Sequence, residues 1–298
     1  MDAFISHASE DADLAIRVEK FLEQNGLKVW LDRSDIRLGV LLREELQAQI
    51  RNSRTLVLLW SAPASDSRWV AAEIMMAFHL GRFIIPCVVD DTPVPHFLRN
   101  TVFLDLQHDE NDASRRLGRA VREPPAGANK LPPIVRSPSA KLDQTIRAVS
   151  GVQMKELSLI GKGDFNQAIE MHTLVDETLQ RAGRQWRLDP MIINLNGYHC
   201  KNAYMLKHWN AICAGRPPQD PVLAQGESYF FEALYVNPND LSAVNGLGSI
   251  LFYELELEAA EFFVQKAIDL ARQQGLDYSA SKHDLALIRR HQKLNTVV

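Results

Sequence analysis

The sequence is poor in cysteine and in long apolar runs, and these two shortages narrow the class of protein. Its three cysteines, Cys87, Cys200 and Cys213, are widely spaced and odd in number, which argues against a disulfide framework and for a reducing compartment. The longest apolar runs, around residues 56–60 and 83–89, are far too short to cross a bilayer. No signal peptide precedes the first predicted strand. We therefore expect a cytoplasmic protein without a membrane partner.

Surplus positive charge and phosphate-binding glycine motifs are also missing. The formal net charge is -4, whereas a nucleic-acid partner would require a basic face. One arginine-rich stretch, residues 115–122, is flanked by acidic residues and is typical of a solvated helix. The first half contains neither G-x-G-x-x-G nor a phosphate loop, so it does not resemble a dehydrogenase or an NTPase. The composition, 46% hydrophobic and 23% charged over 298 residues, suits a globular protein of two domains.

Strand and helix patterns alternate from residue 2 to about residue 122. The predicted strands read "AFIS", "KVWL", "TLVLLW", "FIIPCVV" and "TVFLDL". Helical patterns separate them, the first beginning at a Ser9 cap and ending at Gly26, the last beginning at Asp112. This alternation predicts an α/β fold, a doubly wound parallel five-stranded sheet with helices on both faces. Ligands bind beyond the carboxyl ends of such strands, where Ser6, Asp32 and Ser61 lie.

The helix within "SDSRWVAAEIMMAFHLGRF" carries a carboxylate where burial is expected. Asp66 or Ser67 can cap its start, and Gly81 can end it in a left-handed turn. Trp69 and Glu73 lie one turn apart on one stripe of this apolar helix. An unpaired buried carboxylate would cost several kcal/mol. Glu73 therefore requires either solvent or a function.

The second half has a different character. Five prolines in "EPPAGANKLPPIVRSP" indicate a linker, assigned to residues 123–139. Residues 140–298 read as helices, interrupted at "RLDP", "GRPPQDP" and "VNPND". One helical pair has Leu247 and Gly248 in its first helix and Ala260 and Ala267 in its second, and Ala233 precedes Ala267 by 34 residues. This half resembles a tetratricopeptide (TPR) repeat array, whose period is 34 residues. An unspecialised helical bundle is the alternative.

Four stretches of the first half resemble the successive motifs of a TIR domain. They are "DAFISHASED", "VWLDRSDIRLG", "LVLLWSAPASDSRWVAAEI" and "FIIPCVV". They occur in the family's order, and the resemblance covers about residues 1–122. The resemblance implies a flavodoxin-like sheet. It also implies one of two activities, because many TIR domains cleave NAD⁺ between nicotinamide and ribose and others are scaffolds that bind one another.

The same resemblance assigns roles to individual residues. The W-x-x-x-E pattern of the family maps onto Trp69 and Glu73, which makes Glu73 the expected catalytic residue. The family's BB loop maps onto "DRSDIRLG", with Gly39 at the motif's glycine, and the first-strand loop maps onto "SH". The expected substrate-binding residues are Trp69, Ser6, His7, Asp32 and Gly39.

The chemistry is consistent with one carboxylate. Glycoside hydrolysis usually needs a second carboxyl group as acid, but nicotinamide bound to ribose is cationic and leaves as a neutral ring. An ionised Glu73 could stabilise the positively charged ribose, and Trp69 could stack on a flat ring. As an alternative, Glu73 pairs with Arg37 or Arg43, and Trp69 is a core or contact residue.

These patterns lead to a set of expectations about function. We expect an NAD⁺ glycohydrolase or ADP-ribosyl cyclase that takes NAD⁺ as substrate and has no cofactor and no metal, since His199, Cys200, His208 and Cys213 match no usual ligand spacing. Assembly through TIR–TIR contacts into an oligomer or filament, a protein or peptide ligand of the helical half, and a role in defence or cell-death signalling follow from the resemblance. The rivals are a non-enzymatic TIR adaptor and an enzyme acting on NADP or a nucleoside.

Overall fold

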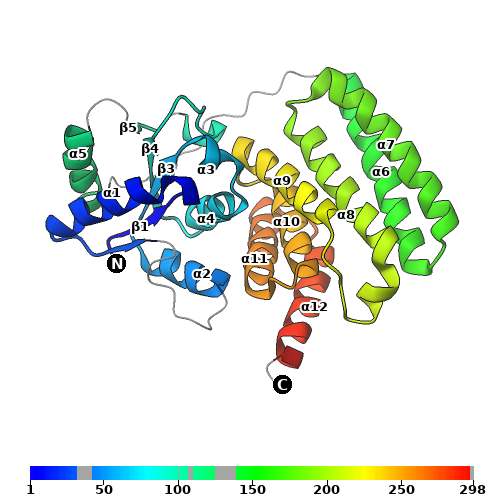
Figure 1. The fold of residues 1–298 in the computed structure, drawn as a ribbon. Coiled ribbons are helices and arrows are strands. Elements are labelled where there is room, and N and C mark those ends of the chain that lie inside the picture. The colour runs from blue at the N-terminus through cyan, green and yellow to red at the C-terminus, as the bar shows by residue number, and fades with distance from the viewer. Residues whose placement is uncertain (32–41, 100, 107–109, 125–138, 296–298) are drawn as a thin grey trace. The chain divides into compact units, whose positions relative to one another are not determined.

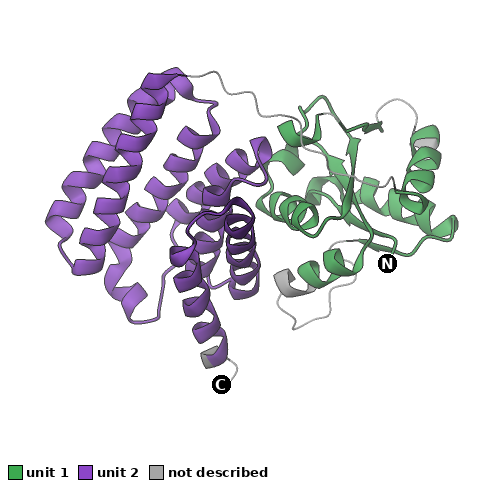
Figure 2. Ribbon diagram, turned by 180° about the vertical axis from the view of Figure 1, so that it is seen from behind, with its two compact units in different colours: residues 1–133 green, residues 134–298 purple. Residues whose placement is uncertain are grey.

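The chain forms two compact units, residues 1–133 and 134–298 (Figure 2). The computed structural model describes residues 1–31, 42–99, 101–106, 110–124 and 139–295. The predicted linker, residues 123–139, falls almost entirely outside these ranges. None of the described helices is long and apolar enough to cross a membrane.

Unit 1 is built around a five-stranded parallel sheet with the order β2-β1-β3-β4-β5. Its strands are β1 (Ala3–Ser6), β2 (Val29–Leu31), β3 (Thr55–Trp60), β4 (Phe83–Val88) and β5 (Leu104–Asp105). Every residue of β1 and β3 is buried, as expected for parallel strands covered on both faces. The predicted α/β fold class, a doubly wound five-stranded sheet followed by an all-helical part, is confirmed.

Helices cover both faces of this sheet (Figure 1). On one face α1 (Ala12–Gln24) and α5 (Glu110–Arg122) share an apolar cluster with alternate strand residues such as Ile5 and Val57. On the other face α4 (Arg68–His79) contacts β1, β3 and β4, and α2 (Leu42–Asn52) packs beside it. Two shorter helical pieces, η2 (His96–Leu98) and α3 (Ala62–Asp66), lie in the connections.

Two predicted boundaries in unit 1 are wrong. The first helix does not begin at a Ser9 cap, because a 3₁₀ turn, η1 (Ser9–Asp11), precedes α1. Neither η1 nor α1 has a side-chain hydrogen bond from its N-cap residue. The strand predicted over residues 101–106 is regular only at β5. Edge strands are often short, and Val102, beside β5, is 80% exposed.

All regular secondary structure in the described residues of unit 2 is helical (Figure 1). Its helices are α6 (Ala140–Lys162), α7 (Phe165–Trp186), α8 (Pro190–Cys213), α9 (Pro221–Val236), α10 (Leu241–Tyr253), α11 (Leu257–Gln274) and α12 (Ser279–Asn295). Each helix contacts the next, and α8 also contacts α6 and α10. The three predicted interruptions fall between helices, and Asp189, Asp220 and Asp240 cap the helices that follow them.

Glycines allow three of these helices to close around one aromatic ring. Phe230 on α9 is fully buried. A Cβ atom added at Gly197 on α8 or at Gly246 on α10 would lie 2.7 Å or 2.3 Å from that ring. At Gly248 it would lie 2.6 Å from Val264 on α11. These positions therefore serve close helix packing.

Candidate active site

The carboxyl ends of the strands gather polar side chains where the order of the sheet reverses. Strands β2 and β3 lie on opposite sides of β1, so the connections after β1 and after β2 leave in opposite directions. In sheets of this topology, ligands bind in the crevice at that reversal. Ser6 is the last residue of β1, and Ser61 directly follows β3.

Helix α4 brings Glu73 to this part of the sheet. Ser67, one of the two expected caps, accepts a hydrogen bond from the Val70 amide at 3.3 Å. Gly81 has a φ of 66° and follows the end of the helix, as expected. Every residue from Val70 to Ala77 is buried, because α4 packs on the sheet over most of its length.

Glu73 is buried and tied to the first strand. Glu73 is only 2% exposed, and the Ser6 hydroxyl donates a hydrogen bond to Glu73 Oε2 at 2.5 Å. Such a short distance is typical of a hydroxyl that donates to a carboxylate. Two candidates that lie 67 residues apart in the sequence therefore meet at the switch point. The bond holds the carboxylate in one orientation.

The other candidates divide into two groups. His7 follows Ser6 and is 6% exposed, whereas Trp69 lies one turn before Glu73 and is partly exposed. Asp32 and Gly39 lie outside the described residues, so their roles stay predictions. The alternative pairing of Glu73 with Arg37 or Arg43 stays a prediction for the same reason, since neither side chain is described.

Three further polar residues, Asp11, Ser61 and Asp90, lie near the strand ends. The sequence placed Ser61 at such an end, but none of the three was among the expected catalytic or substrate-binding residues. The Ser61 hydroxyl donates to Asp11 Oδ2 at 2.5 Å and accepts from the Ala64 amide at 3.1 Å. The Ala62 amide donates to Asp90 Oδ2 at 2.8 Å. Side chains thus link the segments that follow β1, β3 and β4, since Asp11 ends η1 and Asp90 lies two residues beyond β4. A polar residue within two positions of the end of a buried strand is the signal that points to Ser61 and Asp90.

The charge of this edge is fixed in part by local hydrogen bonds. A hydrogen bond from Thr92 lowers the pKa of Asp90 below its ordinary value, and the amides of Ala62 and Thr92 act in the same direction. Cys87, in β4, contributes no reactive thiolate, because burial raises its pKa to about 12. Among the residues that the structure describes, no group of three or more His, Cys, Asp or Glu side chains is placed to hold a metal ion.

Comparison with known proteins identifies the first unit. Residues 3–120 match the family model of the TIR domain. A solved TIR domain, that of the Toll-related receptor TRR-2 of Hydra magnipapillata, is 26% identical, with a TM-score of 0.38, and the match covers 41% of this chain and 98% of that one. The family-model match therefore assigns the TIR domain to residues 3–120. The matched model does not extend into the helical unit.

Three curated relatives carry names that state an activity. The probable 2' cyclic ADP-D-ribose synthase TcpO of Methanobrevibacter olleyae is 32% identical over 95 residues, which cover 30% of this chain and 28% of the relative. The 2' cyclic ADP-D-ribose synthase AbTIR of Acinetobacter baumannii is 34% identical over 74 residues (24% and 28%). The 2' cyclic ADP-D-ribose synthase BtTIR of Bacteroides thetaiotaomicron is 32% identical over 74 residues, which cover 24% of this chain and 26% of the relative. The chain thus spans only about a quarter of the length of each relative.

Proposed function

Because residues 3–120 form a TIR domain, we propose that this domain cleaves NAD⁺ and releases nicotinamide, with Glu73 as its catalytic residue. The observation that carries the proposal is the buried Glu73 carboxylate, held by Ser6 beside the switch point of the sheet. A scaffold has no need of a carboxylate at that position. The names of the three curated relatives support the same chemistry.

The reaction breaks the bond between the nicotinamide nitrogen and C1 of its ribose. Both electrons of the bond return to the ring, which leaves as neutral nicotinamide, so no acid is required. The ribose becomes oxocarbenium-like, and a fixed negative charge next to it lowers the barrier. In this proposal Glu73 supplies that charge, and Trp69 stacks against a flat ring of the substrate.

The nucleophile that completes the reaction decides the product. Water would add to C1, release one proton and leave ADP-ribose. A hydroxyl within the same molecule would form a new C–O bond, lose its proton and leave a cyclic isomer. The relatives' names favour cyclisation through a 2' oxygen, and we extend that product to this chain as part of the proposal.

The direct test is incubation of the purified full-length protein with NAD⁺, followed by chromatography of nicotinamide and of the sugar product. Glu73→Gln should reduce nicotinamide release roughly a hundred- to thousandfold and leave the far-UV circular dichroism spectrum unchanged. Glu23→Gln makes the same chemical change at an exposed position of α1 and should leave the rate unchanged. A wild-type protein that leaves NAD⁺ intact at every concentration would favour a non-enzymatic adaptor. Turnover of NADP or a nucleoside, but not of NAD⁺, would favour a TIR enzyme that acts on a different nucleotide or nucleoside.

The proposal extends to assembly and to the helical unit. We infer that the TIR domains associate into an oligomer or filament and that the helical unit is a TPR-like array that binds a protein or peptide. Support comes from the succession of packed helices and from the small residues at their contacts, which suit a repeat stack. Specific activity should then rise with protein concentration, and constant activity over a hundredfold dilution of a monomer would contradict assembly.

A role in defence or cell-death signalling follows from NAD⁺ consumption. In cells that express the active protein, NAD⁺ should fall and growth should slow. The Glu73→Gln variant should do neither at equal expression. Growth arrest by that variant would separate toxicity from NAD⁺ cleavage.

A further inference from the structure

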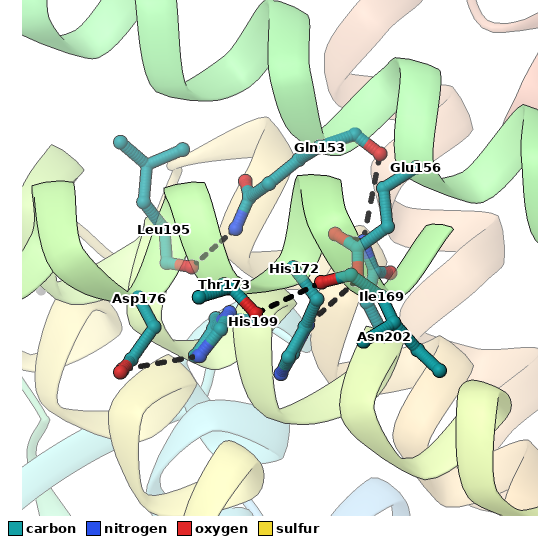
Figure 3. A network of polar contacts seen from close by, with 9 residues as sticks. All are labelled: Gln153, Glu156, Ile169, His172, Thr173, Asp176, Leu195, His199 and Asn202. Atoms are coloured by element: carbon teal, nitrogen blue, oxygen red, sulfur yellow. Dashed lines mark hydrogen bonds and ion pairs between the residues drawn. The ribbon is translucent and has the colours of Figure 1, made fainter. Parts of the chain in front are cut away.

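A buried polar network joins α6, α7 and α8 of the helical unit (Figure 3). At its centre lies Glu156 on α6, which is fully buried. Its carboxylate is 2.7 Å from His172 Nδ1 on α7 and accepts a hydrogen bond from Asn202 Nδ2 on α8 at 2.9 Å. A carboxylate can only accept, so His172 Nδ1 is the donor. One carboxylate therefore holds three helices together.

A second histidine lies flat against the first. The rings of His172 and His199 are stacked, with centroids 4.0 Å apart and planes inclined by 12°. His199 Nε2, at the edge of its ring, lies 3.5 Å from Asp176 Oδ1 (Figure 3). The Asp176 carboxylate accepts, which places the proton of a neutral His199 on Nε2.

This tautomer explains the surroundings of the remaining ring nitrogen. His199 Nδ1 is buried, and no hydrogen-bond partner reaches it from any described part of the chain. In the neutral ring this atom carries no hydrogen. A second proton would create a buried N–H without an acceptor, which is unfavourable. It would also place a positive charge directly against the His172 ring.

The charged and titratable groups that face His199 come from both neighbouring helices. Burial of the ring lowers the pKa of His199 most, and His172 lowers it further. Glu156 on α6 and Asp176 on α7 act in the opposite direction without reversing the result. The neutral ring is therefore the form that the folded state selects.

We propose that His199 is an acid-sensitive contact, and that its protonation separates α7 from α8 in the helical unit. Because the folded state favours the neutral His199 ring, its contribution to stability is fully present above the ordinary histidine pKa of about 6.5. That contribution to stability is lost as the pH falls below this ordinary pKa and through the lower pKa that His199 has in the folded state. Mild acid should thus loosen α6 and α7 against α8 before it affects α10 and α11.

Hydrogen exchange of the full-length protein tests this at about pH 7.5 and about pH 5.5, the two sides of histidine titration. After correction for the intrinsic effect of pH on exchange, peptides of α6 and α7 should exchange up to about tenfold faster in acid, because pH 5.5 lies about one pH unit below the ordinary histidine value of about 6.5. Peptides of α10 and α11 should not change. His199→Gln cannot take up the proton and should remove the acceleration, whereas His283→Gln, at an exposed position of α12, should retain it.

The outcomes separate cleanly. Equal protection of α6 and α7 at both pH values would overturn the proposal, and so would an acceleration that survives in His199→Gln. If His199→Gln does not fold, NMR titration of the wild-type imidazole rings decides the question. The His199 ring should then take up its proton together with the loss of protection in α7. A ring that titrates with no change in that protection would overturn the proposal.

Discussion

Glu73 in the TIR domain and Glu156 in the helical unit are both buried carboxylates, 2% and 0% exposed, that accept hydrogen bonds from other segments. Their surroundings differ. Glu156, on α6, lies among three helices and accepts hydrogen bonds from side chains of the other two, α7 and α8. Glu73 lies beside the edge where the strands end and the loops begin. Burial alone therefore does not distinguish a packing carboxylate from a reactive one.

The architecture accounts for the difference. In a parallel sheet all carboxyl ends lie on one edge, so polar residues from distant parts of the sequence converge there. In a helix stack each contact involves neighbouring elements and can be closed by its own side chains. A buried carboxylate at the shared edge of the sheet is thus a candidate for chemistry, whereas one inside the stack is a candidate for specifying which helices pair.

The largest expected effect separates these two carboxylates. Glu73→Gln should raise the activation free energy by about 2.7–4 kcal/mol, because a charge that stabilises the transition state is removed. The rate of nicotinamide release should therefore fall roughly a hundred- to thousandfold. Glu156→Gln should leave the rate unchanged and lower the free energy of unfolding by about 1–3 kcal/mol, because buried donors lose a charged acceptor. Steady-state kinetics and denaturant unfolding measure the two effects. The comparison fails if Glu156→Gln is inactive while folded.

A smaller effect on rate is expected at the partner of Glu73. Ser6→Ala removes the hydroxyl that orients the carboxylate, and hydrogen bonds to charged groups are worth about 1.5–3 kcal/mol. The turnover rate should fall by roughly ten- to a hundredfold, and Ser6→Thr, which retains a hydroxyl, should recover part of it. If Ser6→Ala leaves turnover at the wild-type value, the orientation of Glu73 does not depend on this bond.

Packing in the helical unit can be tested without touching the edge of the sheet. Gly246→Ala places a methyl group 2.3 Å from the Phe230 ring, and such overpacking commonly costs about 1–3 kcal/mol. Calorimetry should record a lower melting temperature for the helical unit. Gly151→Ala, on α6 where an added Cβ meets nothing within 4 Å, is the matched control and should not destabilise. Equal melting temperatures for the two variants would show that α10 can shift to accept the methyl group.

The sequence alone could predict the sheet and helix α4, because strand and helix periodicity determine them. It was the resemblance to TIR domains that assigned Glu73 and Ser6 to one site. The sequence could not predict that Ser61 bonds Asp11, since these residues lie 50 positions apart and either could serve as a local cap. The stacking of His172 on His199 was equally hidden, because the register between α7 and α8 depends on packing that periodicity does not encode. The assignments of Asp32 and Gly39 stay predictions.

The smallest expected effect compares two capping serines. Ser61 caps α3 by accepting from Ala64, at 3.1 Å, and Ser139 caps α6 by accepting from Leu142, at 3.2 Å. Loss of either cap should cost about 1 kcal/mol of stability. Ser61 also donates to Asp11, the last residue of η1 in the segment after β1, so Ser61→Ala should in addition raise the KM for NAD⁺ a few-fold with little change in turnover rate. Ser139→Ala should change neither kinetic constant. Identical kinetics for both variants, at matched losses of stability, would mean that the hydrogen bond between Ser61 and Asp11 supports the fold without positioning the site.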